Sequence, residues 1–125
     1  MERVKALVAD GDFGFAELLG QRLGELGFEV ATAADGEEAL RAARRDLPQL
    51  LVADEALTRL DGFKLCRLLK FDKQRAAIAV VLMSSAPTDD GRQIAEAVRA
   101  SAYVPKQVDH QDLLTIAQGL LPKES

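Results

Sequence analysis

Short apolar runs alternate five times with segments of helical periodicity, and this alternation restricts the possible folds more than any other feature. The predicted strands cover residues 4–9, 28–32, 50–54, 78–83 and 102–104. After each strand, apolar side chains recur every three or four residues, as on the buried face of a helix. Strands joined by helices through short loops run parallel, because each helix returns the chain to the same edge of the sheet. The sequence therefore predicts a doubly wound α/β fold with five parallel strands.

Start and stop signals support this division. Gly27 is predicted to end the first helix, and Asp35 with Glu38 three residues later is a capping-box-like start of the second. Asp109 is predicted to begin the last helix. The periodicity of the fourth helix predicts an inner face formed by Ile94, Ala95 and Val98.

Length and composition limit the class of protein. With 125 residues, 48% of them apolar and 29% charged, the chain is predicted to form one globular domain over residues 1–125. Strand-like sequence begins so early that no secretory signal is expected, and no long uncharged apolar run predicts a membrane span. A single cysteine, Cys66, allows no internal disulfide. These features favour the cytoplasm, and the net charge of −4 argues against direct nucleic-acid binding.

Polar side chains follow four of the five predicted strands. They are two carboxylates, a hydroxyl and an ammonium, contributed by Asp10, Asp54, Ser84 and Lys106. In doubly wound sheets, ligands bind beyond the carboxyl ends of the strands, so these four groups are expected at one rim. Clustered carboxylates favour a hard cation such as Mg²⁺, and a lysine holds anionic oxygens. The pattern predicts a phosphoryl pocket in which an aspartate is the nucleophile.

Five segments in register resemble the receiver domains of bacterial two-component response regulators. They are KALVAD at 5–10, LVAD at 51–54, LDGF at 60–63, VLMS at 81–84 and YVPK at 103–106. The resemblance covers the whole chain, and the spacing of the hydroxyl and the lysine from Asp54 agrees with the family's pattern. It implies a flavodoxin-like sheet with strand order 2-1-3-4-5.

The resemblance also implies roles for individual residues. Asp54 would be the phosphoacceptor, and Ser84 and Lys106 would contact the phosphoryl group. Ser84 and Tyr103 would form the switch, with Tyr103 changing rotamer on activation. The implied ligands of Mg²⁺ are Asp10, Asp54 and the backbone carbonyl of Ala56, with Asp12 as a further candidate.

Partners follow from the same resemblance. A histidine kinase or a phosphotransfer protein would supply the phosphoryl group, and phosphotransfer and dephosphorylation would be self-catalysed, so the chain is not expected to be a conventional enzyme. An output domain or downstream protein would contact the surface of the fourth helix, fifth strand and fifth helix. The chain could be one domain of a longer protein.

Two positions depart from the family's pattern. Gly11 stands where a second acid usually follows the first, and Gln107 stands where proline usually follows the lysine. Loss of a carboxylate about 4 Å from a divalent ion forfeits roughly 2 kcal/mol, so weak Mg²⁺ binding is expected. Asp12 could replace the missing ligand, but capping of the first helix is the favoured interpretation. These departures motivate an alternative, a pseudo-receiver that acts as a phosphorylation-independent interaction module.

A third hypothesis, a flavin or nucleotide binder, rests on the fold alone. The spacing of Gly11, Gly14 and Gly20 does not match a dinucleotide-binding loop, and residues 10–13 are acidic where a phosphate would bind. The alternative for Tyr103 is a packed aromatic without a switching role.

Overall fold

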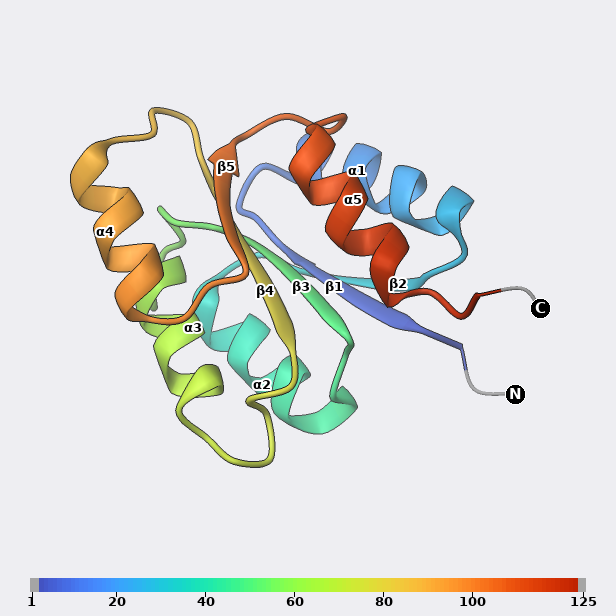
Figure 1. Cartoon of the computed structure of the whole chain (residues 1–125), viewed down its shortest axis with the longest axis horizontal. Helices are drawn as coiled ribbons and strands as arrows, with labels where there is room; N and C mark the ends of the chain where they lie inside the picture. The colour runs from blue at the N-terminus through green and yellow to red at the C-terminus, as the bar shows by residue number, and fades with distance from the viewer. Residues whose placement is uncertain (1–2, 124–125) are drawn as a thin grey trace.

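Five strands form one parallel sheet in the order β2-β1-β3-β4-β5, as the receiver resemblance implied (Figure 1). The computed structural model describes residues 3–123, so the outermost positions of the predicted domain, 1–2 and 124–125, lie outside the described residues. The strands are β1 (Lys5–Ala9), β2 (Glu29–Ala33), β3 (Leu50–Asp54), β4 (Ala79–Ser84) and β5 (Ala102–Pro105). The helices are α1 (Phe13–Leu26), α2 (Gly36–Asp46), α3 (Gly62–Lys70), α4 (Asp89–Ala97) and α5 (Gln111–Leu120).

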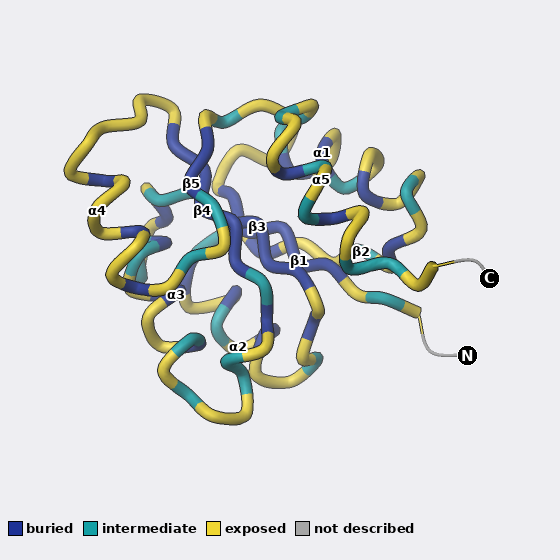
Figure 2. The backbone as a smooth tube through the Cα atoms, viewed as in Figure 1, coloured by how far each residue is buried: buried dark blue, intermediate teal, exposed yellow. Residues whose placement is uncertain are grey.

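Helices cover both faces of the sheet, with α1 and α5 on one side and α2, α3 and α4 on the other (Figure 1). Alternate residues of each central strand point into the two layers, because successive side chains of a strand face opposite sides. In β3, Leu50 and Val52 pack beneath α1 and α5, whereas Leu51 and Ala53 pack beneath the other three helices. The middle strands β1, β3 and β4 are accordingly buried except for one end residue each, Lys5, Asp54 and Ala79 (Figure 2).

The predicted helix boundaries are largely confirmed. Gly27 ends α1 with φ 116°, in the left-handed region that glycine adopts at little cost. Asp35 caps α2 by accepting a hydrogen bond from the Glu38 backbone N–H at 2.9 Å. Thr88 caps α4 in the same way through the Gly91 N–H.

Two predictions about the later helices were wrong. Ile94 was expected on the inner face of α4, yet 45% of its surface is exposed, because α4 directs only Ala95 and Val98 into the core. The last helix begins at Gln111, two residues later than expected, with His110 as the capping residue. Asp109 instead forms an ion pair with Arg22 of α1 at 3.1 Å.

No helix within residues 3–123 combines the length and the apolar character needed to cross a membrane.

Candidate functional site

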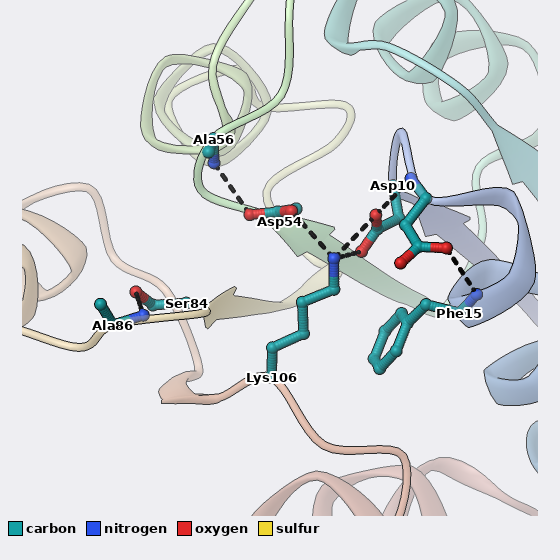
Figure 3. A network of polar contacts seen from close by, with 8 residues as sticks. Asp10, Phe15, Asp54, Ala56, Ser84, Ala86 and Lys106 are labelled. Carbon is teal, nitrogen blue, oxygen red and sulfur yellow. Dashed lines mark hydrogen bonds and ion pairs between the residues drawn. The ribbon is translucent and has the colours of Figure 1, made fainter.

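Three of the predicted site residues meet at the carboxyl rim of the sheet (Figure 3). Asp10 follows β1, Asp54 ends β3 and Lys106 follows β5. The Lys106 Nζ lies 2.9 Å from the nearest carboxylate oxygen of Asp10 and 3.2 Å from that of Asp54. The parallel strands therefore bring together two acids and a base that are far apart in the sequence.

This cluster is largely withdrawn from solvent. The side chain of Asp10 is only 3% exposed, and those of Asp54 and Lys106 are 14% and 15% exposed. Burial favours the neutral form of the Lys106 amine, but its hydrogen bonds and ion pairs with Asp10 and then Asp54 outweigh burial and raise its pKa. The lysine therefore stays charged and balances one of the two carboxylates.

Two contacts that do not involve the carboxylates also hold Lys106 in the pocket. Its backbone N–H donates to the Ser84 carbonyl at 2.9 Å, which extends the pairing of β4 with β5 beyond Pro105. Its Nζ also lies 4.7 Å from the centre of the Phe15 ring, within the range of a cation–π interaction. Gln107 in place of proline therefore does not turn the lysine away from the acids.

Asp54 has a second partner on the loop that follows β3. Its Oδ1 accepts a hydrogen bond from the Ala56 backbone N–H at 3.0 Å, which orients the carboxylate (Figure 3). The other oxygen, Oδ2, faces Lys106. The metal-binding role of the Ala56 carbonyl stays a prediction.

Asp12 is used at the start of α1. Its carboxylate caps the helix by accepting from the Phe15 N–H at 3.1 Å, and its own N–H donates to Asp10 Oδ1 at 2.8 Å. The capping interpretation is thus confirmed, and the backbone N–H of Asp12, not its side chain, supports Asp10. Gly11 between them contributes no carboxylate.

Ser84 lies at the same rim, buried to 2% exposure. Its hydroxyl oxygen accepts a hydrogen bond from the Ala86 N–H at 3.1 Å, which leaves the hydroxyl proton available to another acceptor (Figure 3). Strand alternation places Ser84 on the side of the sheet that carries Leu82 and Tyr103.

Tyr103 forms a second cluster on that side. Its hydroxyl donates to Glu55 Oε1 at 3.0 Å and accepts from the Thr88 N–H at 3.5 Å. The ring is buried, with Phe63 at 6.1 Å and the Arg92 guanidinium at 5.5 Å. The structure thus places Tyr103 as a packed aromatic, between α3 and α4.

A glycine makes room for this tyrosine. A Cβ added at Gly91 would overlap the Tyr103 Oη and crowd its ring carbon Cζ and the Thr88 hydroxyl. The inward position of Tyr103 therefore depends on the absence of a side chain at Gly91.

Sequence reasoning missed three residues that shape these clusters. Glu55 could have been found from the sequence. It directly follows Asp54, and the alternation of side chains along a strand turns it to the opposite side of the sheet, where Tyr103 lies. Phe15 fits the apolar periodicity of the first helix, and no local sequence signal indicates its proximity to Lys106. The role of Gly91 depends on the distance between α4 and β5, which no sequence pattern records.

The carboxylates of the pocket are donors of the kind that a divalent cation takes. Asp10 and Asp54 offer the hard oxygens that Mg²⁺ prefers. Across residues 3–123, however, no three His, Cys, Asp or Glu side chains are grouped so that they could hold a metal ion. A cation would also have to share the two carboxylates with Lys106.

Comparison with known proteins agrees with the geometry. The family model described as response regulator receiver domain matches residues 6–118. The chain is 31% identical over 121 residues to a probable transcriptional regulator, ycf27, of Cyanophora paradoxa, a match that covers 97% of this chain and 49% of that protein. The chain thus spans about half the length of this curated relative.

Solved structures share the fold. The chemotaxis response regulator CheY4 of Vibrio cholerae superimposes with a TM-score of 0.84 at 24% identity, covering 96% of this chain and all of that one. A response regulator of Burkholderia pseudomallei, solved with a phosphorylated aspartic acid, a calcium ion and citrate, gives a TM-score of 0.82 at 22% identity. That match covers 92% of this chain and 66% of the Burkholderia chain.

Proposed function

The chain belongs to the response regulator receiver domain family, and on that premise we propose that Asp54 accepts a phosphoryl group from a histidine kinase or a phosphotransfer protein. The observation that carries the proposal is the Lys106 ammonium, which lies 3.2 Å from Asp54 and 2.9 Å from Asp10. A fixed cation beside a buried carboxylate is the arrangement needed to stabilise charge on a transferred phosphoryl group.

In the transfer, one carboxylate oxygen of Asp54 attacks the phosphorus of a phosphohistidine. The new O–P bond forms as the N–P bond breaks, and the electron pair of that bond stays on the imidazole, which takes up a proton. Lys106 stabilises the negative charge on the phosphoryl oxygens. Water later attacks the phosphorus, which breaks the O–P bond of the acyl phosphate, releases inorganic phosphate and restores the Asp54 carboxylate.

Receiver domains bind Mg²⁺ at the phosphorylation site, and we propose that this one binds it weakly. Asp10, Asp54 and the Ala56 carbonyl would hold the ion, which would supply positive charge to the phosphoryl oxygens. Asp12 is occupied as a helix cap, and Gly11 offers no ligand. The missing carboxylate corresponds to roughly 2 kcal/mol of binding, or about a thirtyfold loss of affinity.

The switch is proposed to pass from Ser84 to Tyr103. The free hydroxyl proton of Ser84 would donate to a phosphoryl oxygen on Asp54, and this would draw the loop between β4 and α4 inward. Thr88, which donates to Tyr103, belongs to the same loop. Movement of this loop would alter the surface of α4, β5 and α5, where we propose that an output domain or a downstream protein binds.

The wider setting is also a proposal. Residues 1–125 would be the receiver domain of a cytoplasmic signalling protein, consistent with the partial coverage of the ycf27 relative. The phosphorylated aspartate of the Burkholderia protein supports the chemistry on the same fold.

Incubation with acetyl phosphate and Mg²⁺, followed by intact mass measurement, tests the acceptor. The wild type should gain one phosphoryl adduct, and Asp54→Asn should gain none. Asp61→Asn is the matched control, because the Asp61 side chain caps α3 through the Lys64 N–H and bonds to none of the pocket residues, and asparagine can also cap. No adduct in the wild type at saturating Mg²⁺ would favour the pseudo-receiver, the alternative that Gly11 and Gln107 motivate.

A further inference from the structure

Helices α3 and α4 lie on the side of the sheet opposite α1 and α5 (Figure 1). Residues of both helices and their ends line a groove. It has a volume of about 270 Å³ and is lined by Asp61, Phe63, Lys64, Arg67, Ile94 and Val98. It is separate from the Asp54 pocket, to which it contributes no residue.

The floor of the groove is apolar and partly open to solvent. Ile94 is 45% exposed, and Phe63 and Val98 lie beside it. Phe71, directly after α3, is 55% exposed. Large apolar side chains that are exposed together on a helix pair are typical of a surface that another molecule covers.

Cations surround this apolar strip. The guanidinium of Arg99 lies 4.4 Å from the centre of the Phe71 ring, and that of Arg67 lies 6.0 Å from it. Within the part of the chain that the structure describes, neither arginine forms an ion pair. Lys64 has only a long contact with Asp61, at 3.9 Å. This gathering of cations stands out in a chain whose net charge is −4.

Arg99 occupies a backbone conformation that is unfavourable for a residue with a side chain. Its φ is 65°, in the left-handed region where a residue with a Cβ is disfavoured. Glycine would fit this position after α4 with less strain. An arginine here therefore has a local cost, and it places a guanidinium over exposed Phe71.

We propose that the α3–α4 groove docks an acidic amphipathic helix of a partner protein. The apolar face of that helix would cover Ile94, Phe63 and Phe71, and its carboxylates would pair with Lys64, Arg67 and Arg99. Helices that enter grooves present apolar anchors at i, i+3, i+4 and i+7, which suits a floor built from two helices. The apolar floor and the acidic chain favour such a helix over a nucleic acid. The proposal does not depend on phosphorylation of Asp54.

A synthetic amphipathic helix of leucine and glutamate is a suitable probe, titrated into the ¹⁵N-labelled chain of residues 1–125 and followed by NMR. Saturable shifts should cluster on α3 and α4. A peptide of the same composition, scrambled to remove the apolar stripe, and a leucine–lysine peptide should both bind much more weakly.

Substitutions around the groove test which residues contact the peptide. Arg67→Ala and Arg99→Ala should each weaken binding about fivefold, the range of an exposed charge pair. Ile94→Glu should weaken it more than tenfold, because it places a carboxylate on the apolar floor. Arg41→Ala on α2, also an exposed arginine, is the matched control and should bind like the wild type.

Three results would overturn the proposal. They are the absence of saturable shifts at millimolar peptide, equal binding of the scrambled peptide, and tighter binding of a single-stranded DNA oligonucleotide to the same residues. The last result would assign these cations to phosphates instead of carboxylates.

Discussion

Asp54 and Glu55 are neighbours in the chain, yet they belong to two clusters of different character. Asp54 faces Lys106 at 3.2 Å in a pocket held together by charge. Glu55 accepts a hydrogen bond from Tyr103 at 3.0 Å in a cluster that depends on the space above Gly91. The charged pocket lacks the family's second acid, whereas the tyrosine cluster is fully packed. The comparison teaches that a buried, hydrogen-bonded tyrosine cluster forms directly beside a charged pocket in which Gly11 stands in place of a second acid.

Loss of the central cation should have the largest effect. Lys106→Met would leave Asp10 and Asp54 facing each other without a counter-charge, so the free energy of unfolding should fall by about 3 kcal/mol in urea denaturation. The double variant with Asp54→Asn should recover part of this loss, and Lys73→Met, at an exposed lysine, should change little. Equal losses in the single and double variants would show that the pocket is not held by charge.

The pH dependence of the same variant provides a further check. Because folding raises the pKa of Lys106, its contribution to stability is fully present below the unfolded value of about 10.5 and is lost as pH rises through the folded pKa. The stability difference between wild type and Lys106→Met should therefore be constant near neutral pH and shrink above this value.

A substitution in the tyrosine cluster should have the next largest effect on the free energy of unfolding. Gly91→Ala should drive Tyr103 out of its buried position and lower the free energy of unfolding by about 2 kcal/mol. Tyr103 is the only tyrosine and the chain has no tryptophan, so intrinsic fluorescence reports this residue alone. Gly24→Ala, where an added Cβ meets nothing within 4 Å, should instead stabilise the protein by about 0.5–1 kcal/mol. An unchanged Tyr103 signal in Gly91→Ala would contradict the steric account.

Restoring an acid at position 11 should strengthen Mg²⁺ binding in the charged pocket, the cluster that lacks a second acid. Gly11→Asp should tighten Mg²⁺ binding about thirtyfold in calorimetric titration, or roughly 2 kcal/mol. A Cβ at Gly11 would meet only the Ala34 carbonyl oxygen, at an ordinary 3.6 Å. Gly24→Asp adds the same charge away from the pocket and should leave the affinity unchanged. If Gly11→Asp also leaves the affinity unchanged, the missing carboxylate does not limit Mg²⁺ binding.

The smallest expected effect is at Glu55. Glu55→Gln keeps an acceptor for the Tyr103 hydroxyl but removes its charge, which should cost about 1 kcal/mol of stability. In a Tyr103→Phe background the same change should cost almost nothing, and a double-mutant cycle measures the difference. A coupling near zero would remove Glu55 from the tyrosine cluster.

Much of the fold and part of the site could be predicted. The convergence of Asp10, Asp54 and Lys106 followed from one rule, that the carboxyl ends of parallel strands share an edge. The capping role of Asp12 followed from its position before an apolar helical stripe. Ile94 was misplaced because periodicity identifies an apolar residue but not whether a neighbouring helix covers it. The packing of Tyr103 was left open because two environments suit the same short strand.

The sequence by itself determined the alternation of strands and helices, the buried faces and the set of polar strand ends, because these depend on the local spacing of residue types. Only the tertiary structure decided that Lys106 bridges both acids, that Glu55 holds Tyr103 and that Gly91 makes room for it. Lys106 and Asp10 are 96 residues apart, and Tyr103 and Glu55 are 48 apart. Contacts at such separations depend on how helices and strands pack in three dimensions, and local sequence patterns do not encode those distances.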